Sequence, residues 1–127
     1  MPRPSPLQPT AAELKILSVL WDRGESTVRE VHEVLQQDRR TGLTTTLKIL
    51  QIMTRKGLVR RDSDVYPHRY RAAAGAEKTQ AGLVRDLARK AFDGSVSQLL
   101  IRAVEDGGLS DEELKELRAL IDEVRKG

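Results

Sequence analysis

The stretch from Thr41 to Gly57, TGLTTTLKILQIMTRKG, is the feature that most constrains the fold of this 127-residue chain. Threonines stand where a helix would begin, an aliphatic stripe runs through the middle, and Arg55-Lys56 precede a glycine. Basic side chains suit a helix C-terminus, and glycine ends helices in the left-handed conformation. The sequence therefore predicts a helix that stops at Gly57.

Two short basic strands are predicted directly after this helix. They are Leu58–Arg61 and His68–Arg71, joined by a turn that contains two aspartates, a serine and Pro67. A helix that runs straight into a basic hairpin is the arrangement of a winged helix-turn-helix domain, whose last helix enters the major groove of DNA.

Two earlier helices would complete such a domain over residues 10–74. Thr10–Glu13 and Thr27–Glu30 are capping boxes, and apolar residues follow each of them at helical spacing. We interpret Trp21 as a core anchor and His32 as a partly buried structural residue. Residues 36–42 are polar and are predicted to form the turn before the third helix. Residues 1–9 carry four of the five prolines and are expected to be a disordered leader.

The third helix has two candidate buried stripes, and periodicity does not choose between them. One consists of Leu43, Leu47 and Leu50, and the other of Thr46, Ile49, Leu50 and Met53. Burial of the second leaves an outer face of Thr44, Leu47, Lys48, Gln51 and Arg55. Hydroxyl, ammonium, amide and guanidinium groups are those that read base edges, and a leucine can touch a thymine methyl. A merely solvated polar face is the alternative, which the basic hairpin disfavours.

Charge is distributed unevenly along the chain, although the net charge is only +3. Residues 39–71 hold nine basic and two acidic side chains, which gives 9 − 2 = +7. Residues 105–127 hold four basic and eight acidic side chains, which gives 4 − 8 = −4. A basic middle segment favours a polyanionic partner, and we expect this to be double-stranded DNA.

Several kinds of site are not expected in this sequence. The absence of cysteine excludes disulfides, thiolate metal sites and a cysteine nucleophile. His32 and His68 are the only histidines, and their separation does not support a zinc site. We find no catalytic constellation and no phosphate-binding glycine loop, so we expect neither an enzyme nor a cofactor. No segment resembles a signal peptide or a membrane span, and we expect a cytoplasmic protein.

Residues 75–127 are predicted to form three short amphipathic helices. They cover roughly residues 77–92 and 96–105 and a last helix that includes residues 114–124. The capping boxes Ser95–Gln98 and Ser110–Glu113 precede the second and third. Apolar side chains at three- and four-residue spacing suggest a dimerisation surface made of Leu99, Leu114, Leu117, Ile121 and Val124. So few residues cannot easily bury their apolar faces alone. We therefore predict a homodimer; the alternative is that these helices fold back on the N-terminal domain.

With these elements placed, the chain resembles the penicillinase-repressor family (BlaI/MecI type, with copper-responsive CopY relatives) of bacterial winged-helix regulators. The matching segments are Glu13–Trp21, Thr27–His32, Thr44–Met53, Arg55–Arg61, His68–Arg71, Ala91–Ser95 and Leu109–Leu114. The resemblance implies a mainly α fold with a small β wing, followed by a short three-helix dimerisation domain. It also implies a dimeric repressor on an inverted-repeat operator, and favours the second stripe because the family packs the position of Thr46 inward.

The predicted DNA-binding residues lie on the third helix and the wing. They are Thr44, Thr45, Leu47, Lys48, Gln51, Arg55, Lys56, Arg60 and Arg69. Thr44 and Thr45 are expected at the helix start, where they would cap the helix or grip a phosphate. Arg69 is the favoured phosphate contact of the wing.

Two departures from the family concern induction. Without cysteine, this chain lacks the C-terminal cysteine motif with which copper-responsive relatives sense metal. The Asn-Phe pair at which antibiotic-responsive members are cleaved falls at Arg102-Ala103, so a sensor protease is only weakly supported as a partner. A winged-helix protein–protein adaptor without specific DNA binding is the alternative function, since fold alone does not decide function. The basic segment argues against it.

Overall fold

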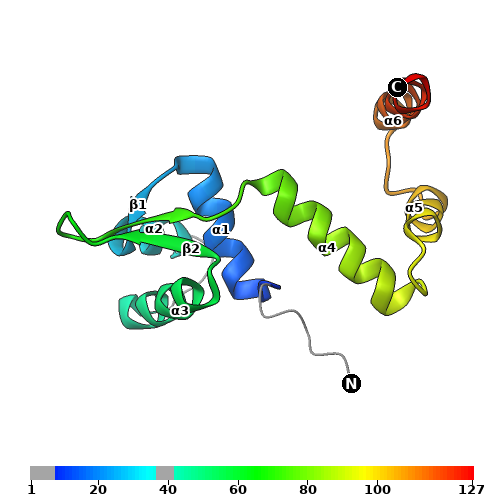
Figure 1. Ribbon diagram of the computed structural model, residues 1–127. Helices are drawn as coiled ribbons and strands as arrows, with labels where there is room; N and C mark the ends of the chain where they lie inside the picture. Colours follow the sequence, from blue (N-terminus) through cyan, green and yellow to red (C-terminus); the bar gives the residue numbers. More distant parts are fainter. Residues whose placement is uncertain (1–7, 37–41) are drawn as a thin grey trace. The chain divides into compact units, whose positions relative to one another are not determined.

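The computed structural model describes residues 8–36 and 42–127, which form six helices and one small antiparallel sheet (Figure 1). The chain divides by its internal packing into two units, residues 1–81 and 82–127. This mainly helical architecture with a small sheet confirms the predicted fold class. The division falls inside a helix, and the predicted domain boundary after residue 74 stays a prediction.

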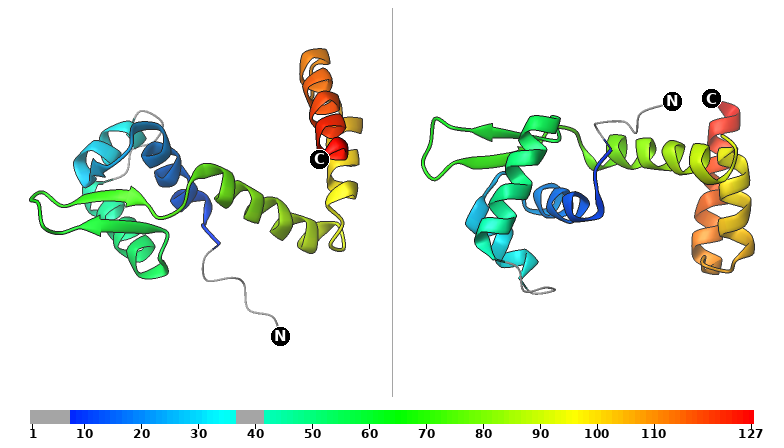
Figure 2. Two further views of the ribbon diagram at one scale, coloured as in Figure 1. Left: turned by 45° about the horizontal axis from the view of Figure 1, so that its top comes forward. Right: turned by 90° about the horizontal axis from the view of Figure 1, so that it is seen from below.

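The first unit builds a three-helix layer on one side of a three-stranded sheet (Figures 1 and 2). Its helices are α1 (Ala11–Arg23), α2 (Val28–Leu35) and α3 (Leu43–Lys56), and its strands are β1 (Ser26–Thr27), β2 (Val59–Asp62) and β3 (Arg69–Ala72). The strands are antiparallel in the order β1-β3-β2, so the hairpin of β2 and β3 is extended by the short segment before α2. The predicted turn before α3 falls largely on residues 37–41, which lie outside the described residues.

The core of this unit is aliphatic, with one tyrosine from the sheet. Its buried apolar residues are Ile16, Leu17, Val19, Leu20, Val31, Leu50, Met53, Val59 and Tyr70. Trp21 packs against this cluster, and its indole Nε1 donates a hydrogen bond of 2.9 Å to the carbonyl of Ala74. The indole thereby ties α1 to the segment that follows β3, which confirms the interpretation of Trp21 as an anchor.

Three of the four predicted capping boxes are present. At Ser95 the hydroxyl accepts from the Gln98 N–H at 3.1 Å, but the reciprocal bond of a box is not formed. At α1 the Thr10 hydroxyl accepts from the Glu13 N–H at 3.2 Å, and the Glu13 carboxylate accepts from the Thr10 N–H at 2.8 Å. Thr27 with Glu30 and Ser110 with Glu113 make the same reciprocal pair at α2 and α6. Each box satisfies backbone donors that a helix start leaves unpaired.

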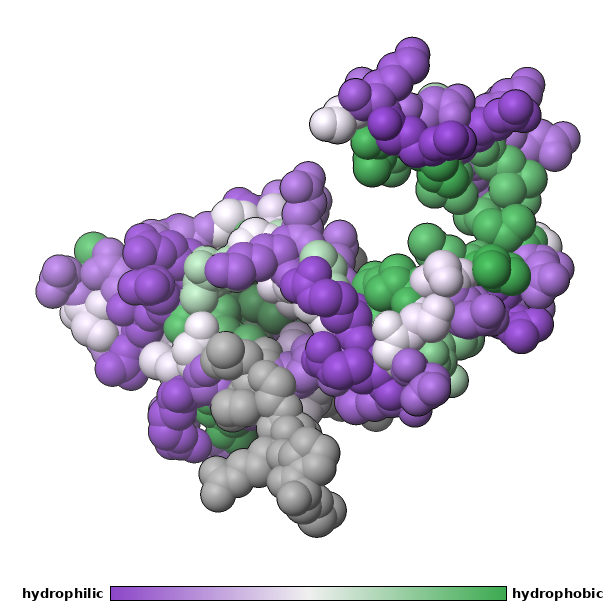
Figure 3. All heavy atoms as spheres, turned by 45° about the vertical axis from the view of Figure 1, so that its right-hand side comes forward, coloured by the Kyte–Doolittle hydropathy of each residue, from purple (hydrophilic) through white to green (hydrophobic). Residues whose placement is uncertain are grey.

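The second unit contains most of α4 (Ala76–Ala91), which begins in the first unit, together with α5 (Val96–Glu105) and α6 (Asp111–Lys126). Ala88 is the buried residue of α4, and neither α5 nor α6 contains a buried residue. Exposed apolar side chains on these helices are Val84, Leu87, Val96, Leu100, Ile101, Val104, Leu114, Leu120, Ile121 and Val124. Figure 3 shows the apolar surface they present. Within the described residues, no helix combines the length and apolar character needed to cross a membrane.

Candidate nucleic-acid interface

The end of α3 joins this helix directly to the wing. Gly57 takes the left-handed conformation with φ 83° and ψ 14°, which glycine adopts without steric cost. The N–H of Gly57 donates to the carbonyl of Thr54 at 3.2 Å, and the N–H of Leu58 donates to that of Met53 at 2.9 Å. This pair of bonds is the Schellman motif. Only two residues, Gly57 and Leu58, therefore separate α3 from β2.

The rotation of α3 about its axis is set by the second predicted stripe. Thr46, Leu50 and Met53 are buried, whereas Leu43 at the other candidate stripe is 37% exposed. Thr46 is accommodated in the core because its hydroxyl lies 3.1 Å from Nδ1 of the buried His32, so each polar group has a partner. This bond ties α2 to α3 and confirms that His32 has a structural role.

The opposite side of α3 is exposed over its whole length. It carries Thr44, Thr45, Lys48, Gln51 and Arg55, with Leu47 half-buried beside them. The helix starts at Leu43 with Gly42 as its N-cap, so the interpretation of Thr44 as the N-cap is wrong. Glycine has no side chain with which to cap, and Thr44 and Thr45 present their hydroxyls in the first turn, where backbone N–H groups attract anions.

Lys56, at the last turn of α3, is held by an acidic residue of α1. Its Nζ lies 2.9 Å and 3.0 Å from the two carboxylate oxygens of Glu13, a residue only 3% exposed. Burial raises the pKa of Glu13, but the Thr10 N–H and the Lys56 ammonium lower it more, and the net pKa lies below its ordinary value. The ammonium of Lys56 therefore serves the packing of α3 on α1.

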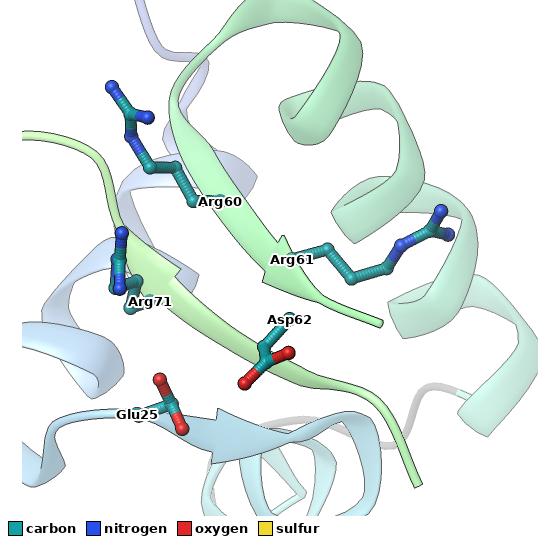
Figure 4. Close-up of a pocket in the computed structure, with 5 residues that line it drawn as sticks. All are labelled: Glu25, Arg60, Arg61, Asp62 and Arg71. Carbon is teal, nitrogen blue, oxygen red and sulfur yellow. The ribbon is translucent and has the colours of Figure 1, made fainter. Parts of the chain in front are cut away.

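The register of the hairpin decides which arginines lie on the side of α3. Arg61 is opposite Tyr70, and both share the face of the buried Val59, so Arg61 extends toward α3 (Figure 4). Arg60 is opposite Arg71 on the other face of the sheet. Arg69, not Arg61, was the favoured wing contact, although the apolar Val59 and Tyr70 mark the face of the sheet that Arg61 shares.

Arg69 is engaged within the protein. Its Nε lies 3.3 Å from a carboxylate oxygen of Glu25, and its guanidinium also lies 3.7 Å from Glu30. The pKa of Glu30 is lowered, first by the hydrogen bond from the Thr27 N–H and less by the nearby Arg69 and Arg23. Arg69 thus joins β3 to the segment before α2, on the face turned away from α3.

Two comparisons with known proteins find relatives of this sequence. The family model described as Penicillinase repressor matches residues 9–123. The chain belongs to the penicillinase-repressor family. It is 36% identical over 117 residues to the transcriptional regulator BlaI of Mycobacterium tuberculosis, covering 91% of this chain and 83% of that protein. It is 20% identical over 112 residues to the methicillin resistance regulatory protein MecI of Staphylococcus aureus, covering 88% and 91%.

Membership of the penicillinase-repressor family assigns this chain to transcriptional regulators, which are not enzymes. In the described ranges 8–36 and 42–127, no group of three or more histidine, cysteine or acidic side chains could hold a metal ion.

The five predicted dimerisation residues all lie in the second unit. Leu99 and Leu117 are half-buried, whereas Leu114, Ile121 and Val124 are 38%, 57% and 70% exposed. Leaving side chains of this kind in water is unfavourable, at about 25 cal/mol per Å² of apolar area. Three of the five side chains are exposed in the single chain, and the dimerisation surface stays a prediction.

Proposed function

We propose that this chain is a dimeric, sequence-specific transcriptional repressor that binds an inverted-repeat operator through the outward face of α3. The observation that carries the proposal is the continuous exposed face of Thr44, Thr45, Lys48, Gln51 and Arg55, on a helix whose other side is buried. A helix with such a face fits the major groove, where amide and ammonium groups distinguish base pairs. Family membership supports the same function, and we place the protein with the chromosome in the bacterial cytoplasm.

The residues on this face have different proposed roles. Thr44 and Thr45 bind a phosphate at the positive end of α3, because both are exposed in its first turn. Lys48 lies one turn further along and donates to a guanine edge, with Gln51 next to it. Leu47 contacts a thymine methyl, and Arg55 contacts the backbone at the far end of the helix.

The wing contributes phosphate contacts on the same side of the domain. Arg61 is the best-placed arginine, because the register turns its side chain toward α3 and its Nε already donates to the Ser63 hydroxyl at 3.0 Å. Arg60 and Arg69, predicted from sequence, lie on the other face of the sheet, and Lys56 neutralises Glu13. We therefore assign these three residues no base contact.

The second unit supplies the dimer contacts in this proposal. Leu99, Leu114, Leu117, Ile121 and Val124 pack against the same residues of a second copy, since two-fold pairing buries one patch against itself. Dimerisation links two α3 helices and matches them to half-sites one helical turn, or a multiple of it, apart. Proteolytic induction is not part of the proposal, because α5 carries Arg102-Ala103 where the related cleavage pair would lie.

The experiment is operator binding by the purified protein, with its own promoter as the probe, at two salt concentrations. Lys48→Ala should lose about 1–3 kcal/mol of discrimination at one base pair of each half-site and keep its melting temperature. Lys115→Ala on α6 is the matched control, since it removes an equally exposed lysine from the other unit. Binding of single-base operator variants with the wild-type ranking would show that Lys48 reads no base. Absence of specific binding by the wild type would favour the adaptor function.

A further inference from the structure

The face of the β2–β3 sheet turned away from α3 carries a group of charged side chains that has no part in the proposed DNA binding. This outer face consists of Arg60 and Asp62 on β2 and Arg69 and Arg71 on β3. A pocket of about 220 Å³ opens there, lined by Glu25, Arg60, Arg61, Asp62 and Arg71 (Figure 4).

Two arginines stand directly opposite each other across this pocket. Arg60 and Arg71 are cross-strand partners in the β2–β3 ladder, and both are exposed. Side chains at such positions start about 5 Å apart, and like charges directly opposite destabilise a sheet. The repulsion between the two guanidinium groups therefore lowers the stability of the isolated protein. An anion bound between them would replace this repulsion by two attractions.

The carboxylates at the rim of the pocket are bound to other groups. A Glu25 oxygen lies 3.3 Å from Nε of Arg69, and an Asp62 oxygen accepts the N–H of Asp64 at 3.0 Å. Among residues 8–36 and 42–127, no carboxylate lies within ion-pair distance of Arg60 or Arg71. These two guanidinium groups keep their donors available.

We propose that Arg60 and Arg71 form a binding site for a small anion, a phosphate or carboxylate group of a small molecule. Arginine pairs bind such groups through parallel N–H···O bonds, and this planar geometry is why arginine is preferred for them. Pockets for drug-sized ligands begin at about 300 Å³, so this pocket suits one anionic group rather than a large organic molecule. The Arg60 and Arg71 side chains lie on the face of the sheet opposite α3, away from the proposed DNA interface. Arg61 lines the pocket, but its guanidinium extends toward α3 (Figure 4).

The test is a titration of the full-length protein with inorganic phosphate, and in parallel with succinate, at constant ionic strength, followed by amide NMR shifts. Saturating shifts should be confined to residues 59–62 and 69–72, and the melting temperature should rise with phosphate. The double variant Arg60→Gln/Arg71→Gln should bind about tenfold more weakly or worse, since it loses charge-assisted hydrogen bonds. Arg118→Gln on α6, another exposed arginine, should bind as the wild type does.

The result separates this site from two alternatives. Shifts spread over all basic residues, absence of saturation, or unchanged affinity in the double variant would overturn the proposal. A DNA phosphate is the second possible source of the anion. If the double variant binds operator more weakly and its salt dependence falls by about two units, the two arginines belong to the DNA interface and the separate site is refuted. The single variant Arg71→Gln repeats the test should the double variant not fold.

Discussion

Replacement of Lys56 by methionine tests whether this residue serves the fold or the DNA. Methionine keeps much of the volume of the stem but removes the ammonium that lies 2.9 Å and 3.0 Å from the Glu13 carboxylate. Removing one partner of a fully buried ion pair costs about 3–5 kcal/mol, and an exposed pair is worth about 0.2–1 kcal/mol. Glu13 is buried, whereas the side chain of Lys56 is 29% exposed, so the structure places this pair between the two limits. We expect a loss of about 2 kcal/mol in the free energy of unfolding.

The assay is thermal unfolding followed by fluorescence at a fixed protein concentration. Trp21 is the sole tryptophan and is bonded to Ala74, so its emission reports the first unit. For a unit of this size, about 2 kcal/mol lowers the melting temperature by about 8–16 °C. Lys15→Met on α1 is the control, since Lys15 is exposed and its replacement should leave the melting temperature within about 2 °C of wild type.

The pH dependence of stability is a second, independent test of the ion pair between Glu13 and Lys56. The pKa of Glu13 in the folded protein is lowered from 4.5, so its ionised form stabilises the fold above that value. This contribution is lost as the pH falls below about 4.5 toward the folded-state pKa. Lys56→Met removes a main cause of the lowering while burial remains, so the decline in stability at acidic pH should flatten. An unchanged melting temperature together with weakened operator binding would refute this reasoning and make Lys56 a DNA contact.

Three further outcomes are expected. Arg61→Ala should weaken binding to operator and to random DNA alike and reduce the salt dependence by about one unit, as measured by titrations at several salt concentrations; a loss confined to operator would place it at base edges. Thr46→Val should lower stability by about 1–3 kcal/mol in denaturant unfolding, because it leaves a buried histidine nitrogen without its partner; full stability would show that the bond carries no weight. Leu117→Asn with Ile121→Asn should give monomers in sedimentation and weak operator binding, whereas a monomeric wild type at micromolar concentration would contradict the dimer itself.

The features predicted correctly from sequence are those that depend on interactions between residues close together in the chain. Capping boxes such as Thr10 with Glu13 hold because a helix start satisfies its own donors within four residues. The stop at Gly57 is equally local, because it depends on one residue's backbone freedom. These signals place the helices and the hairpin. The outward face of α3 was not fixed by them, since only the family resemblance favoured one of its two candidate buried stripes.

The features missed depend on pairs far apart in the chain. Lys56 is predicted to contact DNA, and nothing near it in sequence indicates that its ammonium donates to Glu13 of α1 in the folded chain. Thr46 is a polar residue in an otherwise aliphatic stripe, and only the folded chain brings His32 of α2 to it as a partner. Strand register decides which wing arginines face α3. The apolar residues Val59 and Tyr70 mark that face of the sheet in the sequence.

The direct passage from α3 through Gly57 into β2 means that the length of this link decides which side chains of β2 face α3. Side chains of a strand alternate between its two faces, so one residue inserted between Gly57 and Val59 would turn the strand over. Arg60 would then point toward α3 and Arg61 away from it, while the composition of basic residues stayed the same. The proposed phosphate contact and the proposed anion site are thus kept apart by the parity of a two-residue connection, and not by the number of arginines.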